Sequence, residues 1–232
     1  MDPNTVSKMK HLSTCNDYNY RNIRNKMILS VALVAISVDF YSSANAVNDP
    51  LVLNPLYREA YAKLESRDYR AALQLFEKLL ADSPRSPGAY YGRAKVKQEL
   101  GDNKSALQDY SKSIELDPVN SKAFSNRGLV YGSLGDLKKA LADFDQAIKL
   151  NPKFDYAYSN RGVTKGALSD PRGAVQDFSK AIEINPRYGT AWRNRGITRE
   201  LLGDLKGACS DWKQALSLGQ LDVRQWVAFQ CK

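Results

Sequence analysis

The sequence contains almost no histidine: a single one, His11, stands among 232 residues. Histidine is the commonest general base and a common zinc ligand, so its scarcity argues against a hydrolytic or zinc-dependent enzyme. Cysteine occurs three times, as Cys15, Cys209 and Cys231. The sequence has no phosphate-binding loop and no nucleophile–base motif. We therefore expect a protein that is not an enzyme and that uses no cofactor, no metal and no small-molecule substrate.

The sequence also lacks a hydrophobic run of membrane-spanning length. The apolar run at 27–38 has 12 residues and stops at Asp39, whereas a spanning helix needs about 20. A basic stretch at 21–26 precedes the run, and small residues at 44–46 follow it where a signal peptidase cuts. Residues 1–46 are thus predicted to be a leader and cleaved signal peptide, which indicates export to a periplasm or thylakoid lumen. The alternative is a membrane anchor formed by uncleaved residues 27–41.

Acidic residues are outnumbered, and the formal net charge is +9. This excess suits acidic protein partners or an anionic membrane surface. Its structural alternative is a solvated, lysine-rich helix surface. The charge is not accompanied by the stacking motifs of RNA-binding modules, so nucleic acid is not an expected partner.

The sequence does have a strong 34-residue period. Five consecutive segments, 53–86, 87–120, 121–154, 155–188 and 189–222, agree when they are placed in register. Position 20 of every segment is alanine: Ala72, Ala106, Ala140, Ala174 and Ala208. Position 24 is always aromatic: Phe76, Tyr110, Phe144, Phe178 and Trp212. Position 4 is always large and apolar: Leu56, Tyr90, Phe124, Tyr158 and Trp192. A period of this length indicates stacked helix pairs.

Each segment carries two amphipathic helical patterns with a turn between them. In the third segment these patterns predict helices at about 123–134 and 137–150. An aspartate stands where the second helix should be capped in four segments: Asp102, Asp136, Asp170 and Asp204. Its carboxylate can accept hydrogen bonds from the free amides of that helix. A proline near the end of the unit, as in Pro118 or Pro152, prevents the second helix from running on.

This pattern, typified by AFSNRGLVYGSLGDLKKALADFDQAIKLNP at 123–152, resembles the tetratricopeptide repeat family. The resemblance implies an all-α, right-handed superhelical solenoid of five helix-turn-helix repeats at 53–222, after a short linker at 47–52. The repeats look most similar to exported bacterial, especially cyanobacterial, members. The family implies a non-catalytic scaffold that binds extended segments of other proteins in a concave groove. The alternative is an architectural subunit of an envelope or thylakoid membrane complex that uses its convex or basic surface.

The chain continues beyond the fifth repeat, and Gly219-Gln220 provides a helix stop. Aligned as the start of a sixth repeat, Trp226 falls at position 4, so residues 223–232 are predicted to form a C-terminal capping helix. Cys209 near the start of one helix and Cys231 near the end of the next should lie close together, because neighbouring helices run antiparallel. A Cys209–Cys231 disulfide suits an exported protein. The alternative is a buried thiol and an exposed thiol.

Arginine at position 7 and aspartate at position 23 occur together. Repeats 2 to 5 have both and repeat 1 has neither, which predicts four structural ion pairs: Arg93–Asp109, Arg127–Asp143, Arg161–Asp177 and Arg195–Asp211. The alternative is a ladder of arginines that binds an anion. The matching aspartates favour structural pairs, because buried charges are normally paired.

Asparagine recurs at position 6 in repeats 3 to 5, as Asn126, Asn160 and Asn194. The family resemblance places this position in the concave groove, where amides can donate to and accept from a peptide backbone. The alternatives are local solvation of the helix and a contact with the adjacent repeat. Other candidates for the groove are tyrosines and cations on the first helices: Tyr57, Tyr61, Tyr91, Lys95, Lys122, Tyr156 and Arg193. The tyrosines offer rigid contact area, and the cations suit an acidic partner.

Overall fold

The computed structural model describes residues 54–231. The predicted leader at 1–46 and linker at 47–52 lie outside these described residues. The chain divides into two compact units, whose described parts are 54–152 and 153–231.

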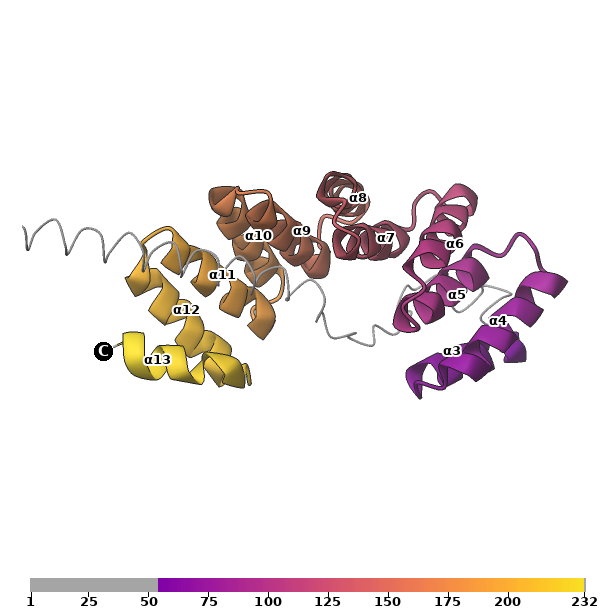
Figure 1. The fold of residues 1–232 in the computed structure, drawn as a ribbon, viewed down its shortest axis with the longest axis horizontal. Coiled ribbons are helices and arrows are strands. Elements are labelled where there is room, and N and C mark those ends of the chain that lie inside the picture. The colour runs from indigo at the N-terminus through magenta and orange to yellow at the C-terminus, as the bar shows by residue number, and fades with distance from the viewer. Residues whose placement is uncertain (1–53, 232) are drawn as a thin grey trace, which may run out of the picture. The chain divides into compact units, whose positions relative to one another are not determined.

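The first unit consists of three helix pairs. Their helices are α3 (Pro55–Glu65) and α4 (Tyr69–Asp82), α5 (Pro87–Glu99) and α6 (Asn103–Leu116), and α7 (Ser121–Ser133) and α8 (Leu137–Leu150). Each helix packs on the next along the chain, and α5 also contacts both α3 and α7 (Figure 1). The first helices of the pairs therefore form one layer, and the second helices lie behind them.

The second unit contains two helix pairs and a C-terminal extension. The pairs are α9 (Asp155–Ala167) with α10 (Pro171–Ile184) and α11 (Gly189–Leu201) with α12 (Leu205–Ser217). The short turn η2 (Leu221–Val223) and the helix α13 (Arg224–Gln230) follow, and both pack on α12. Residues 54–231 contain helices and no strand, which confirms the predicted class of helix-turn-helix repeats with a capping helix. Within this range no helix has the length and apolarity to cross a membrane.

Side-chain caps start most of these helices. The aspartate before each second helix accepts a hydrogen bond from a backbone N–H three residues later, in repeat 1 through Asp68 as well as in the four repeats with a predicted cap. The first helices of repeats 1 to 3 are capped by Asn54, Ser86 and Asn120, which were not among the predicted caps. Each cap satisfies an amide that the helix itself leaves without a partner.

The turn inside each pair needs one residue with left-handed backbone. Glycine occupies this position in three repeats, for example Gly135 with a φ of 83°. Arg67 and Ser169 take the same conformation in the other two repeats, with φ of 61° and 66°. A side chain disfavours this conformation, so these two turns are held by the helices on either side rather than by local preference.

The core of each pair lies between a small residue and a ring. The alanine at position 20 is fully buried in every repeat, and the aromatic residue at position 24 is at most 1% exposed. Position 8 is small because the ring lies against it: a Cβ added at Gly196 would lie 2.5 Å from two atoms of the Trp212 indole. Close approach of the two helices therefore fixes where the side chains of the first helix point.

Candidate interaction surface

In four repeats, the arginine at position 7 of the first helix forms an ion pair with the aspartate at position 23 of the second helix. In repeat 2, Arg93 Nε and Nη2 each lie 2.8 Å from one carboxylate oxygen of Asp109. The same two-bond geometry joins the other three pairs: Arg127–Asp143, Arg161–Asp177 and Arg195–Asp211. The aspartate side chains are at most 8% exposed. Each bridge therefore joins the two helices of a pair in a largely dry setting.

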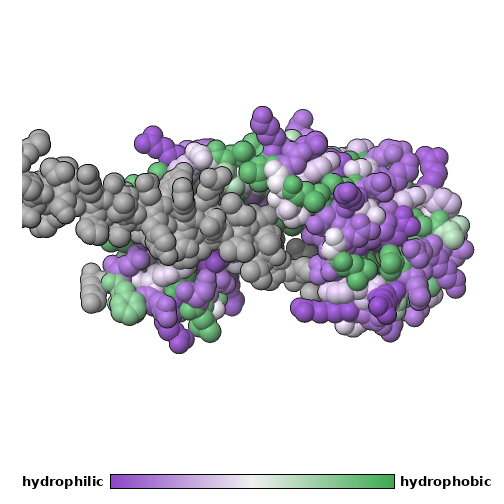
Figure 2. Space-filling view, viewed as in Figure 1, coloured by the Kyte–Doolittle hydropathy of each residue, from purple (hydrophilic) through white to green (hydrophobic). Residues whose placement is uncertain are grey.

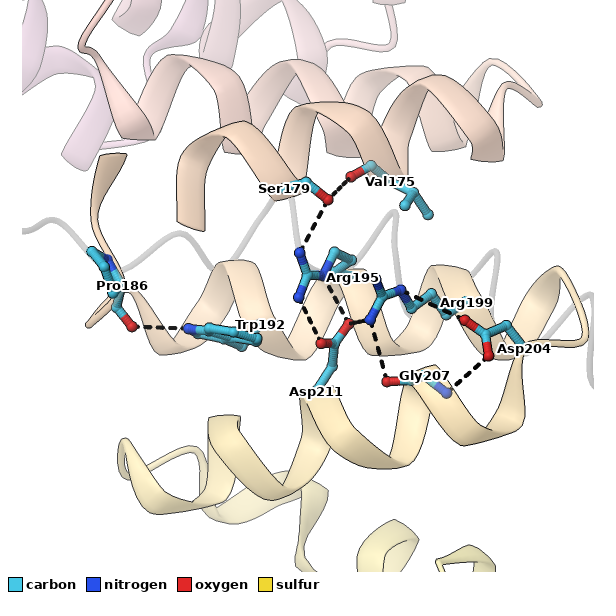
Figure 3. A network of polar contacts seen from close by, with 9 residues as sticks. All are labelled: Val175, Ser179, Pro186, Trp192, Arg195, Arg199, Asp204, Gly207 and Asp211. Atoms are coloured by element: carbon cyan, nitrogen blue, oxygen red, sulfur yellow. Dashed lines mark hydrogen bonds and ion pairs between the residues drawn. The ribbon is translucent and has the colours of Figure 1, made fainter. Parts of the chain in front are cut away.

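A second cation reaches three of these aspartates from position 11. Lys97 Nζ lies 2.7 Å from Asp109, and Arg199 Nη1 lies 2.9 Å from Asp211 (Figure 3). Lys165 repeats the contact in repeat 4. These cations were not among the predicted site residues, although position 11 is basic in four of the five repeats. The exception is repeat 3, where Tyr131 stands at this position.

Two of these arginines also contact the preceding repeat. Arg195 donates to the Ser179 hydroxyl of repeat 4 at 3.0 Å. Within repeat 5, its guanidinium carbon lies 4.8 Å from the centre of the Trp192 ring. Arg127 makes the equivalent bond to Ser111 in the first unit. Hydrogen bonding to Asp109 raises the pKa of Arg93 above its ordinary value, and Asp143 raises the pKa of Arg127 in the same way. These guanidiniums are already neutralised, so this geometry favours a structural role over an anion-binding ladder.

In the first unit, α3, α5 and α7 present a surface that we call the A-helix face, with Tyr61, Tyr91, Lys95, Lys122 and Asn126. All five side chains are half-buried. The Lys95 ammonium lies 5.9 Å from the centre of the Tyr91 ring, and Asn126 Nδ2 donates to the Tyr91 hydroxyl at 2.8 Å. The surface is thus aromatic and cationic, and it is joined by contacts between neighbouring repeats.

Two features of the first unit differ from the predicted groove. Tyr57 is only 7% exposed and packs in the first hydrophobic cluster, with its ring 4.8 Å from that of Tyr61, so it offers a ligand little surface. The Asn126 amide is engaged by Tyr91 of the preceding repeat. That contact corresponds to the alternative in which the asparagine joins adjacent repeats.

In the second unit, considered by itself, α9 and α11 carry the corresponding predicted residues Tyr156, Asn160, Arg193 and Asn194, which we call the A-helix face of that unit. The two asparagines are 6% and 5% exposed, so their side chains, like that of Tyr57, offer a ligand little surface. The ring of Tyr156 lies 4.8 Å from that of Tyr188. Arg193 lies at the end of this face and contacts the C-terminal extension, with its Nε 2.5 Å from Oδ2 of Asp222.

Residues 221–231, which we call the cap, cover the outer side of α12. Val223 is fully buried, and the ring of Trp226 lies 5.4 Å from that of Trp212. Cys209 and Cys231 lie at disulfide geometry, with Cα atoms 5.3 Å apart, inside the range of about 4.4–6.8 Å that such a bond requires. The structure therefore brings together the two cysteines of the predicted disulfide, and the bond itself stays a prediction.

Within residues 54–231, no group of histidine, cysteine and acidic side chains has the arrangement of a metal site. The acidic side chains with the least exposure are the aspartates that the arginines already bind. The half-buried tyrosines and lysines of the A-helix face can present aromatic and cationic groups to another molecule.

Models of the tetratricopeptide repeat match residues 57–121 and 121–154. No curated protein sequence matches the chain. Among solved structures, TTC0263 from Thermus thermophilus has a TM-score of 0.63 and 24% identity, over 76% of this chain and 96% of that one. MamA from Desulfovibrio magneticus has a TM-score of 0.64 and 18% identity, over 75% of this chain and 97% of that one.

A third similar structure is YrrB, described as a TPR protein with an unusual peptide-binding site. Its TM-score is 0.58 at 21% identity, over 76% of this chain and 91% of that one. At such identities these structures establish the fold alone. Proteins of this fold are generally non-catalytic modules for protein–protein interaction. The family models, the 34-residue period and the paired helices agree that this chain contains tetratricopeptide repeats.

Proposed function

We propose that this protein is a scaffold or assembly factor whose A-helix face binds extended segments of partner proteins. The observation that carries the proposal is the group of tyrosines, lysines and an amide on α3, α5 and α7. Tyrosine supplies rigid contact area with few torsions to fix, and lysine supplies charge complementarity to acidic segments. The unusual peptide-binding site of the similar protein YrrB supports peptide binding as a use of this fold.

The proposal is tested by reversing charge on one face and comparing it with the other. Lys95→Glu combined with Lys122→Glu changes the A-helix face. Lys104→Glu combined with Lys138→Glu makes the same change of charge at exposed sites on the second helices. Both proteins are used to capture partners from the native compartment, and circular dichroism checks that both are folded. We expect the first variant to lose partners that the second retains, whereas equal capture by both would refute the proposal.

The alternative function, attachment to an anionic membrane or complex, would use the outer sides of the second helices. Exposed cations on these helices support it, including Lys104, Lys138, Lys139, Arg172 and Lys206. Aspartate caps stand beside several of them, and Lys139 pairs with Asp136 at 2.7 Å, which weakens the local excess of positive charge. Hydrophilic residues predominate on the face in Figure 2, with hydrophobic ones in small groups. Flotation with phosphatidylserine vesicles separates the two functions, because only attachment to a membrane predicts loss of binding in the Lys104/Lys138 variant.

We also propose that the protein acts after export, in a periplasm or thylakoid lumen. The basic, apolar and small-residue zones of residues 21–46 support this location. Mass spectrometry of the protein isolated from its native membrane and lumen fractions should find Val47 as the mature N-terminus. Recovery of a full-length chain in the membrane fraction would favour the anchor at 27–41 instead.

A further inference from the structure

The cap supplies a carboxylate to a cation of the A-helix face. Arg193 stands on α11, next to Asn194, and its Nη1 donates to the amide oxygen of that asparagine at 3.4 Å. The buried Nε of Arg193 lies 2.5 Å from Oδ2 of Asp222, which is part of the cap. The Asp222 side chain is 48% exposed, whereas that of Arg193 is 21% exposed. An acidic group from the protein itself therefore occupies the position that an acidic side chain of a ligand would take beside Arg193.

The cap is short and has few contacts of its own. α13 has seven residues, and no side chain forms a hydrogen bond to the free amides at its N-terminus. Isolated helices of this length are not stable in water. Its noncovalent contacts are centred on buried Val223 and on Trp226, which lies against Trp212. A bond between Cys209 and Cys231, 22 residues apart, would favour the arrangement in which the cap is packed on α12. The factor in the chain-entropy model is on the order of 100. Such a bond would therefore reduce the fraction of molecules in which Asp222 has separated from Arg193.

We propose that Arg193, which donates to the buried Asn194, forms a site for an acidic side chain of a partner segment, and that the cap closes this site through Asp222 while Cys209 and Cys231 are joined. This inference rests on the proposed function, since it names the ligand chemistry and the control of the A-helix face. A dithiol reductant opens the site. It gives two electrons and two protons to the S–S bond, which becomes two thiols, and the reductant becomes a disulfide. Asp222 then separates from Arg193, and an aspartate or glutamate of the partner replaces it.

The test uses the mature chain and two fluorescein-labelled peptides, (Glu-Gly)5 and the matched (Gln-Gly)5. Fluorescence anisotropy measures binding with and without a dithiol, at low salt because exposed charge pairs are screened. Asp222→Asn removes the competing carboxylate without touching the cysteines. Glu183→Gln is the matched control, because it removes the same charge from an exposed site in the same unit.

We expect about 10-fold tighter binding of the glutamate peptide after reduction, and a similar gain for oxidised Asp222→Asn, the range of one charged contact exchanged for another. The glutamine peptide and the Glu183→Gln protein should show no such gain. Arg193→Gln should abolish the gain in both cases. Hydrogen exchange should show faster exchange of residues 221–231 after reduction.

Equal affinity for the glutamate peptide in the oxidised, reduced and Asp222→Asn proteins would overturn the inference. A gain that persists in Arg193→Gln would overturn it as well. If partner capture from the native compartment still depends on Lys95 and Lys122, the proposed function survives that result. If capture is also insensitive to those lysines, both proposals fail, so the two failures are distinguishable.

Discussion

Asp211→Ala should destabilise the C-terminal end of the protein more than any surface substitution. The Asp211 side chain is 1% exposed and accepts hydrogen bonds from Arg195 Nε at 2.9 Å, Arg195 Nη2 at 2.8 Å and Arg199 Nη1 at 2.9 Å. Without the carboxylate, Arg195 loses both of its bonds to α12 and stays 12% exposed. Breaking a buried pair from one side costs about 3–5 kcal/mol.

The expected loss lies near the lower end of that range. Arg199 is 26% exposed and already lies 3.8 Å from Asp204, so it can turn toward that carboxylate and toward water. Arg195 keeps its bond to the Ser179 hydroxyl and its stacking on Trp192. These contacts reduce the free-energy cost of removing the Asp211 carboxylate. We therefore expect Asp211→Ala to lower the unfolding free energy by about 3 kcal/mol.

Urea unfolding followed by tryptophan fluorescence measures this loss locally. The three tryptophans of the chain, Trp192, Trp212 and Trp226, all lie in repeat 5 and the cap, so the signal reports the end of the array that the substitution affects. Glu183→Ala, at a 68% exposed side chain, is the control and should change stability by less than about 0.5 kcal/mol. A loss below about 1 kcal/mol for Asp211→Ala would refute the assignment of a buried, strongly coupled bridge.

Three further predictions concern single contacts. Hydrogen bonds from Lys139 lower the pKa of Asp136, so its pKa in the folded protein is below the unfolded value. The contribution of Asp136 to stability should therefore be present above about pH 4 and be lost as the pH falls further. Asparagine at position 136 can still cap the start of α8, so the Asp136→Asn protein should lose less unfolding free energy on acid titration. Gly196→Ala should cost about 1–3 kcal/mol in thermal unfolding because the new Cβ meets the Trp212 indole. Intact mass after alkylation should show Cys209 and Cys231 blocked until the protein is reduced, whereas two freely alkylated thiols would contradict the disulfide.

The elements predicted best from the sequence were those that local rules determine. The helix expected at 137–150 in the third repeat is α8, because Asp136 caps its start and the proline at 152 prevents its continuation. The Arg127–Asp143 geometry also follows from pairing within one repeat, where the two columns vary together. Information of this kind is contained in neighbouring positions and in comparisons between copies.

Contacts between repeats were harder to predict, because the same column can face different neighbours. Position 6 is Gly92 in repeat 2 since the Phe76 ring of repeat 1 fills the place where a Cβ would stand. In repeat 3 the same position is Asn126, which instead donates to Tyr91. The residue at position 6 thus meets different side chains of the preceding repeat in different repeats. The residue types at position 6 alone do not show which neighbour each one meets.

The placement of Arg193 shows why a residue type in a groove column does not by itself define a binding site. Its position predicts a cation that is available to a partner, yet in the structure Arg193 forms an ion pair with Asp222. Asp222 stands at position 34, where the other repeats have Ser86, Asn120, Phe154 and Tyr188, so the residue type at this position does not recur. In the proposed site, docking of residues 221–231 would set the charge that a partner meets, and Cys209 and Cys231 lie close enough for a bond between them to stabilise that docking. The carboxylate that neutralises Arg193 is thus supplied by a residue whose type does not recur among the repeats, so comparison of the copies could not predict this contact.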